Sequence, residues 1–301
     1  MSHGGSRRVV LVALAANVAI SLAKLAAAIA TRSGSMLAEA IHSFADSGNQ
    51  GLLLVGDARA SRPADERHPM GYGREAYFWA LLVAVLLFTL GGVFSAYEGV
   101  HKLGHPSPLS HVGWALAVLG VSLALEGFSF RTAWAEVNRV RGRKGLFGWA
   151  KETGDVNLLV VAFEDLAALT GLTIALAAVL LTSITGDPIF DALGSCVLGV
   201  LLLYVAVFLA SQVRRLITGH SVDPERRAVL EEVWKAHGFQ VLRLAAVWAG
   251  PHKVTVATKV CPADQTISAA ALIDRINAAE RAVRERLPEV IMQFSEPDHV
   301  D

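Results

Sequence analysis

Polar residues recur on one face of an apolar stretch between residues 35 and 56, and their side chains are of types that bind metal ions. Glu39, His42, Asp46, Asn49 and Gln50 are spaced i, i+3, i+7, i+10 and i+11, so a helix places them on one face. Ionisable groups inside a bilayer are costly and usually mark the path of an ion or substrate. A His and an Asp four residues apart can hold one divalent cation between them. The alternative is a polar stripe that packs against neighbouring helices.

An acidic pair, Glu164 and Asp165, lies in a later apolar stretch. At 1.5 Å per residue, Asp46 lies about 16 Å into its stretch and Asp165 about 14 Å into the other. The two stretches run in opposite directions through a hydrocarbon core of roughly 30 Å, so both carboxylates fall near its middle. A divalent cation with His42 as a third ligand would relieve their repulsion, and its binding would release protons. In the alternative reading, Asp165 pairs with Lys24.

Six apolar stretches are long enough to position these residues across a membrane. The chain has 301 residues, of which 53% are hydrophobic, and a membrane helix needs roughly 20 residues. The stretches are Val9–Ala30, Ser35–Gly56, Ala76–Tyr97, Val112–Phe130, Val156–Ser183 and Pro188–Ala210. Charged residues become frequent after Arg215. We therefore expect a six-helix membrane domain over residues 1–217 and a small domain over residues 218–301.

The tail has the pattern of a mixed α/β domain. Two amphipathic helices are predicted, and Gly250-Pro251 between two apolar runs indicates a hairpin. The expected elements, in the order α-β-β-α-β, are Pro224–Gly238, Leu242–Ala249, Lys253–Val260, Ile267–Leu287 and Val290–Phe294. This order suits a small sheet with helices on one face.

The net charge is zero, but Lys and Arg are concentrated in one set of alternate loops. The opposite set has only Arg32 and Lys102, so the positive-inside rule places both termini and the tail in the cytoplasm. In a bacterium the chain would lie in the inner membrane. Loop topology already explains the basic run 139–144, so no nucleic-acid partner is expected. The rich set is Arg7, Arg8, Arg59, Arg62, Arg67, Arg74, Arg139, Arg141, Arg143, Lys144, Lys151, Arg214 and Arg215.

Several motifs together resemble the cation diffusion facilitator family over nearly the whole chain. They are HSFAD at 42–46, HPMGYGRE at 68–75, EGFSF at 126–130, the acidic Asp165, DPIFDALGS at 187–195 and FSEPD at 294–298. The resemblance implies six membrane helices followed by a cytoplasmic ferredoxin-like domain. It also implies a homodimer in the lipid bilayer that exports zinc or a related divalent cation in exchange for protons. It implies no tightly bound cofactor and no enzymatic reaction.

The resemblance also implies a ligand set. His42 and Asp46 match the family's pair in the second span, and Asp165 matches the second ligand of the pair in the fifth span. The position four residues before Asp165 is Val161, so one expected ligand is missing. Glu164 is a less certain ligand, because it lies about 100° around the helix from Asp165. Other groups that could complete the site are Asn17, Asn49, Asn157 or water.

Further metal sites are weaker in the sequence. Asp65 and His68 form a possible loop site, but two ligands make a poor one. In the tail, Phe294 stands where some family members have a metal-binding His. The remaining candidates in the tail are scattered: His237, His252, Asp298 and His299.

The predicted function is a proton-coupled antiporter that exports divalent transition-metal cations, with Zn²⁺ the first expectation. An exporter of Fe²⁺, Mn²⁺ or Co²⁺ from the same family is the alternative, since hard-ligand sites also accept those ions. A membrane metal sensor is the alternative from another class, and it would need a ligand cluster in the tail. No HExxH or GxSxG motif supports a metalloenzyme.

Overall fold

The computed structural model describes residues 3–105 and 108–299, with side chains from residue 17 onward except residue 132. The chain divides into two compact units. The first comprises Met1–Val55, Trp79–Arg143 and Asn157–Ser211, and the second comprises Gly56–Phe78, Lys144–Val156 and Gln212–Asp301. Several helices begin in one unit and end in the other.

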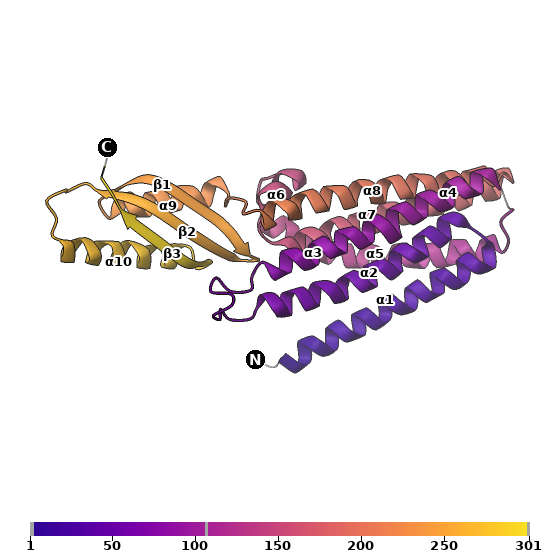
Figure 1. Cartoon of the computed structure of the whole chain (residues 1–301). Helices are drawn as coiled ribbons and strands as arrows, with labels where there is room; N and C mark the ends of the chain where they lie inside the picture. The colour runs from indigo at the N-terminus through magenta and orange to yellow at the C-terminus, as the bar shows by residue number, and fades with distance from the viewer. Residues whose placement is uncertain (1–2, 106–107, 300–301) are drawn as a thin grey trace. The chain divides into compact units, whose positions relative to one another are not determined.

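Long helices that run side by side form the first unit (Figure 1). They are α1 (His3–Thr31), α2 (Gly34–Ala60), α3 (Glu75–Leu86), the π-helical segment η1 (Leu87–Val93), α4 (Phe94–Gly104), α5 (Val112–Arg141), α7 (Val156–Thr185) and α8 (Ile189–Ile217). The apolar stretches in the sequence predict these helices. The π-helical turn corrects the expectation of one uninterrupted α-helix, and Gly91 and Gly92, which have low helix propensity, lie within it.

Four helical segments in the described part of the chain are long and apolar enough to cross a membrane. They are Glu75–Gly104, Val112–Arg141, Val156–Thr185 and Ile189–Ile217. The described apolar part of α1, Asn17–Thr31, is shorter, and α2 carries several charged residues. The six predicted spans therefore stay a prediction for α1 and α2.

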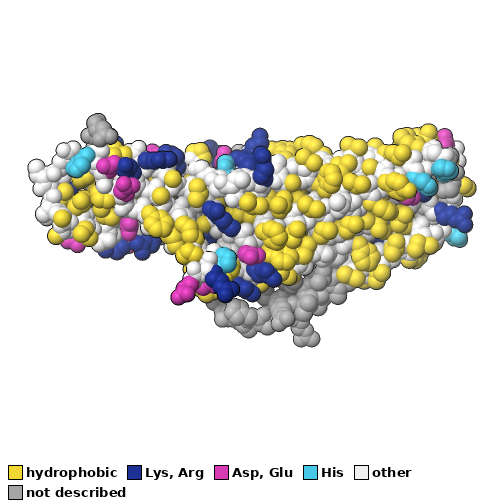
Figure 2. All heavy atoms as spheres, in the orientation of Figure 1, with side chains coloured by type: hydrophobic (Ala, Val, Ile, Leu, Met, Phe, Trp, Pro, Cys, Tyr) yellow, Lys and Arg dark blue, Asp and Glu magenta, His cyan; other side chains and the backbone are white. Residues whose placement is uncertain are grey.

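Hydrophobic side chains cover much of the face of the helical unit shown in Figure 2, as expected for helices in contact with lipid. Exposed examples on η1, α4 and α8 are Leu90, Val93, Val100, Val197, Val200 and Val207.

Helices α4 and α8 pack closely because a glycine on each helix faces the backbone of the other. A Cβ atom on Gly99 would lie 2.5 Å from the backbone nitrogen of Cys196, and one on Gly199 would lie 2.4 Å from that of Ala96. No real side chain tolerates such distances. Small residues therefore hold this pair of helices together at short range, as in other membrane helix pairs.

A buried apolar cluster joins α1, α2, α5 and α7. It contains the small residues of α1 that precede the α1–α2 turn and leucines of α5 and α7. We call it the apolar cluster; its members are Ala27, Ala28, Met36, Ala115, Leu119, Leu172, Ala175 and Val179.

The second unit contains the short helix α6 (Leu146–Glu152), which the sequence did not predict, and the tail. The tail follows the predicted order, with α9 (Pro224–Ala236), β1 (Phe239–Gly250), β2 (Lys253–Pro262), α10 (Ala269–Arg286) and β3 (Val290–Pro297). The sheet has the order β1-β2-β3, with β1 and β2 antiparallel and β2 and β3 parallel, so α10 is the crossover between parallel strands. Both helices share one core with the sheet, made by Trp234, Phe239, Val260 and Ala279.

Candidate metal centre

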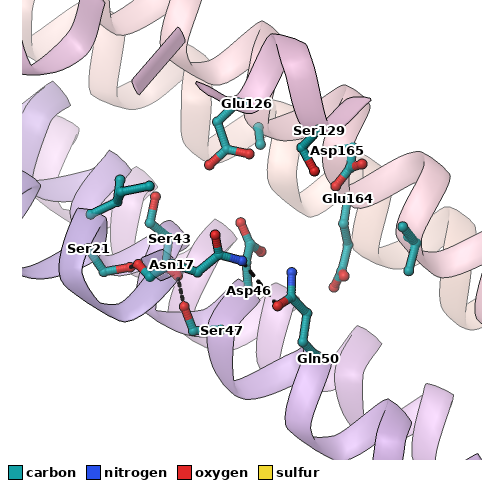
Figure 3. Close-up of a pocket in the computed structure, with 13 residues that line it drawn as sticks. Asn17, Ser21, Ser43, Asp46, Ser47, Gln50, Glu126, Ser129, Glu164 and Asp165 are labelled. Atoms are coloured by element: carbon teal, nitrogen blue, oxygen red, sulfur yellow. Dashed lines mark hydrogen bonds between the residues drawn. The ribbon is translucent and has the colours of Figure 1, made fainter. Parts of the chain in front are cut away.

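A polar cavity lies between α1, α2, α5 and α7 (Figure 3). Its volume is about 40 Å³, enough for an ion and a small number of waters. Oxygen-bearing side chains dominate the lining: Asn17, Ser21, Ser43, Asp46, Ser47, Gln50, Glu126, Ser129, Glu164 and Asp165. Three apolar residues complete it: Ile20, Val161 and Ala168.

Helical spacing explains why these side chains meet. On α2, Ser43, Asp46 and Gln50 are separated by three and four residues, which places them on one face. The same spacing relates Val161, Asp165 and Ala168 on α7, while Glu126 and Ser129 are three residues apart on α5. The apolar surroundings of each helix bury these faces against one another.

The structure brings three of the four predicted ligands to this cavity. Asp46 approaches from α2, and Glu164 and Asp165 approach from α7. His42 is fully buried and does not line the cavity, but its Nε2 lies 3.5 Å from Asp46 Oδ2. Val161, the position of the missing ligand, does line the cavity, so a longer side chain there would enter it.

Several buried polar atoms at this site have no hydrogen-bond partner within the described part of the chain. They include both ring nitrogens of His42, Asp46 Oδ1 and Asn49 Oδ1. A buried polar group without a partner costs roughly 1–3 kcal/mol. Such a concentration around one cavity is typical of a site that receives a ligand and is unusual in a structural core.

The amide side chains discussed above have different positions. Asn49 Nδ2 donates a hydrogen bond to Glu164 Oε1 at 2.7 Å, and Asn17 Nδ2 donates to Gln50 Oε1 at 3.1 Å. Asn157 Oδ1 is buried without a partner and lies outside the cavity lining. Asn17 is therefore the one of the three that lines the cavity, and Asn49 holds Glu164 in place.

The described residues contain no group of three His, Cys, Asp or Glu side chains arranged to hold one metal ion. The carboxylates share a cavity without converging on one point. A bound cation would therefore draw the side chains inward, or water would complete its coordination.

Lys24 belongs to an ion-pair group beside the cavity. It is fully buried, and its Nζ donates to Glu39 Oε1 at 3.1 Å and to Ser43 Oγ at 2.5 Å. Glu126 Oε1 lies 3.9 Å from the same nitrogen. Lys24 thus pairs with Glu39 and Glu126, which differs from the alternative pairing with Asp165. The sequence signal for Glu126 was a polar i, i+3 pair with Ser129 in an apolar stretch.

Asp191 forms a separate buried cluster where α8 begins. Its carboxylate accepts hydrogen bonds from Ser33 Oγ at 2.5 Å, from the Gly34 backbone N–H at 2.6 Å and from Ser35. Lys102 Nζ lies 3.4 Å away and also donates to the Arg32 carbonyl. Asp191 therefore caps the first turn of α2 and joins three helices. The sequence placed Asp191 in the sixth span without this role.

The possible loop site at Asp65 and His68 lies in the second unit. Asp65 accepts hydrogen bonds from the Tyr72 hydroxyl at 2.6 Å and from the His68 backbone N–H at 2.7 Å. The Tyr72 hydroxyl, with the backbone N–H groups, lowers the pKa of Asp65. The His68 ring Nδ1 is 3.7 Å from this carboxylate. These contacts give Asp65 a role in shaping the loop, and metal binding there stays a prediction.

The polar residues of the tail are engaged separately. Asp298 pairs with Lys259 at 2.5 Å, and His237 Nδ1 lies 2.8 Å from the Val233 carbonyl. His252 pairs with Asp155 at 3.2 Å. Phe294 is about half exposed on β3. These contacts do not collect the tail's histidines at one point, as a sensor site would require.

The sequence of this chain is similar to those of known proteins. The family described as "Cation efflux transmembrane domain" matches residues 10–218. The human protein named proton-coupled zinc antiporter SLC30A9, mitochondrial, is 38% identical over 231 residues, covering 76% of this chain. Metal tolerance protein C4 of Arabidopsis thaliana is 35% identical over 224 residues, covering 73% of this chain. The metal cation efflux system protein CzcD of Cupriavidus metallidurans is 30% identical over 123 residues, covering 40% of this chain and 39% of that protein.

The relatives are longer than the part that matches. The matched region covers 41% of the human protein and 49% of the Arabidopsis protein, so the chain spans less than half the length of either.

Proposed function

We propose a specific transport activity on the premise that the chain belongs to the cation efflux family, also called the cation diffusion facilitators. As a member it is a multi-pass integral membrane transporter of cations and not an enzyme. We infer that it exports divalent transition-metal cations from the cytoplasm, Zn²⁺ first, in exchange for protons. The human relative is named a proton-coupled zinc antiporter and the Arabidopsis relative a metal tolerance protein, and both names support this inference.

The observation that carries this proposal is the polar cavity. Asp46, Glu164 and Asp165 line one cavity among apolar helices, with His42 against Asp46. Carboxylates buried together repel one another, and a divalent cation compensates two of the charges at once. We assign these four residues as the cation site, with Glu164 in the supporting position that its hydrogen bond from Asn49 indicates.

Proton exchange follows from the ligand chemistry. Carboxylate and imidazole ligands must be unprotonated to bind a metal, so binding on one side releases protons and release of the metal allows their return. Antiport requires only that these two steps occur on opposite sides of the membrane. Channel activity would move the cation without this exchange.

Several architectural features belong to the same proposal. We place both termini and the tail in the cytoplasm, on the positive-inside pattern of the loops. We also propose six spans, the membrane domain over residues 1–217, a ferredoxin-like domain over residues 218–301, and a homodimer. In a bacterium the protein would lie in the inner membrane.

One observation favours a second cargo. The polar side chains that line the cavity bear carboxylate, amide or hydroxyl groups, whereas the imidazole of His42 lies behind Asp46. Oxygen ligands suit Mn²⁺ in particular, and such hard-ligand sites also accept Fe²⁺. Fe²⁺, Mn²⁺ or Co²⁺ is therefore the alternative cargo of the same site.

Uptake by proteoliposomes tests the proposal. The purified chain is reconstituted, and entry of Zn²⁺, Mn²⁺, Fe²⁺, Co²⁺ and Cd²⁺ is measured with and without an imposed pH gradient. We expect Zn²⁺ flux that the proton gradient accelerates. Flux that ignores the pH gradient would indicate a channel, and transport of iron or manganese without zinc would overturn the assignment of zinc.

A further inference from the structure

The ion pair between Lys24 and Glu39 lies between the polar cavity and the apolar cluster. On α1, Lys24 stands between Ala27 of the apolar cluster and Ser21 of the cavity lining. On α2, Glu39 stands between Met36 of the apolar cluster and Ser43 of the cavity lining. The same order on both helices places the pair just beyond the cavity lining, on the side of the apolar cluster.

The distances from Lys24 Nζ to Glu39 and Glu126 show that Glu39 is hydrogen-bonded to Lys24 and that Glu126 is not. Glu39 is fully buried at 3.1 Å, and a Cβ atom on Gly171 would lie only 3.1 Å from its Oε2, so its carboxylate is closely packed. Glu126 lies at 3.9 Å, beyond hydrogen-bond distance, and 25% of its side chain is exposed. Glu126 also lines the cavity, whereas Glu39 does not.

We propose that Glu126 is a further ligand of the transported cation and that Lys24 is its counter-ion when no cation is bound. The inference rests on the proposed function, because it assigns a new residue to the same cavity. When a divalent cation enters, Glu126 turns from the Lys24 ammonium toward the cation, while Lys24 stays with Glu39 and Ser43.

The position of Glu126 fits this role. It approaches from α5, across the cavity from Ser43 and Asp46 (Figure 3), so it adds a third helix to the predicted set from α2 and α7. Carboxylate oxygen is a ligand for zinc and for harder divalent ions alike. Because Val161 supplies no ligand, a carboxylate from α5 would replace the side chain missing from α7.

Zn²⁺ titration of the purified full chain tests Glu126 directly. Calorimetry compares the wild type with Glu126→Gln, which keeps the shape of the side chain and removes its charge. We expect about 10- to 100-fold weaker binding, the scale of loss on removing a group that tunes a metal site. The matched control is Glu136→Gln on the same helix, whose exposed side chain pairs with Arg139. That control should stay within about twofold of the wild type, as expected for an exposed ion pair.

A second substitution at the same position keeps the test from depending on the Glu126→Gln variant alone. Glu126→Asp retains the charge on a shorter side chain, so we expect an intermediate loss of affinity. Zn²⁺ affinity equal to that of the wild type in both variants would overturn the proposal.

The counter-ion role predicts coupling between Lys24 and Glu126. Lys24→Met with Glu39→Gln removes the buried pair together and leaves no uncompensated charge between them. With Glu126 intact, we expect Zn²⁺ to bind about 3- to 10-fold more tightly, within the range of coupling between contacting residues. In the Glu126→Gln background the same pair of changes should leave the affinity unchanged. An equal effect in both backgrounds would show that Lys24 acts only on packing and would overturn its role.

Asp46→Ala separates failure of this inference from failure of the proposed function. If the wild type neither binds nor transports any of the divalent ions, the proposed function fails and the assignment of Glu126 as a ligand fails with it. If Asp46→Ala weakens Zn²⁺ binding and both Glu126 variants do not, only the inference fails.

Discussion

The carboxylates of Asp46 and Asp191 are both buried or partly buried in the helical unit, but their surroundings differ. Asp191 accepts hydrogen bonds from Ser33, the Gly34 backbone and Ser35, and its lone pairs are occupied. Asp46 Oδ1 has no hydrogen-bond partner among the described residues, and neither ring nitrogen of the adjacent His42 has one. An acid that is already satisfied holds helices together, whereas one with unused acceptors is available to a ligand.

The largest difference between the polar cavity and the cluster around Asp191 should appear in transport. Asp46→Ala and Asp165→Ala each remove a carboxylate from the polar cavity, so we expect divalent-cation flux to fall to the level of empty liposomes. Because Asp46 Oδ1 has no hydrogen-bond partner to lose and Oδ2 lies 3.5 Å from His42 Nε2, too far for a short hydrogen bond, we expect Asp46→Ala to change thermal stability and the proposed dimer little. Zn²⁺ uptake and thermal unfolding of the same preparations check this, and wild-type flux in either variant would contradict the site.

Asp191→Asn should have the opposite pattern. It weakens charge-assisted hydrogen bonds to the first turn of α2, which contribute roughly 1.5–3 kcal/mol each when a charged group is involved. We expect a clear fall in the thermal midpoint in detergent, with Zn²⁺ flux per folded molecule within about threefold of the wild type, because the cavity is untouched. Abolished flux at normal stability would place Asp191 on the cation path.

Val161→His should sharpen the comparison by adding a ligand to the cavity. We expect about 10-fold tighter Zn²⁺ binding, since completing a ligand set is a gain on the scale of metal-site tuning, and slower turnover because the ion must also leave. Glu164→Gln should cause a smaller loss, because Glu164 already accepts a bond from Asn49. Calorimetry checks both. A large loss for Glu164→Gln without a gain for Val161→His would make Glu164 the principal ligand of α7.

The smallest effect is expected at Asp223, which caps α9 in the tail and accepts a hydrogen bond from the Arg226 backbone N–H. Asp223→Ala should weaken the first turn of α9 by about 1 kcal/mol, which amide exchange in that turn would measure as roughly fivefold faster. Transport should be unchanged. Unchanged exchange would show that the cap contributes nothing.

The same cap has a pH dependence with a definite sign. Burial alone would raise the pKa of Asp223, but the hydrogen bonds and charge of Arg226 outweigh it and lower the pKa. A lowered folded-state pKa contributes stability above the unfolded value of roughly 3.9, and that stability is lost as pH falls below it. Amide protection of α9 should therefore decrease on acidification, and Asp223→Ala should remove most of that decrease.

Much of the fold follows from sequence patterns. Helix positions follow from runs of apolar residues, and the element order of the tail follows from amphipathic periods and from the turn at Gly250-Pro251. The π-helical segment η1 was not predicted, because spacing along the chain does not show how Gly91 and Gly92 approach Leu202 and Leu203 of α8. The short helix α6 was also missed, because seven residues give too little periodic signal.

The candidate site was predictable only in part. Spacing along one helix indicates which side chains share a face. Of the α2 residues grouped in this way, Asp46 and Gln50 line the cavity, whereas Glu39, His42 and Asn49 do not. Spacing says nothing about how helices rotate against one another, and so it could not assign Lys24 to Glu39 or bring Glu126 to the cavity. For Asp191 only half of the signal was local. The N–H groups in the first turn of α2 need an acceptor, but the acid that supplies it lies 157 residues away from Gly34.

The most direct measurement is Zn²⁺-driven proton flux, followed with a pH-sensitive dye inside proteoliposomes that contain equal amounts of folded protein. Wild type, Asp46→Asn and Asp191→Asn are compared in one experiment. If cavity carboxylates carry the cation and Asp191 only holds the helices, the wild type and Asp191→Asn will exchange Zn²⁺ for protons and Asp46→Asn will not. Proton exchange by Asp46→Asn at the wild-type rate would contradict the account.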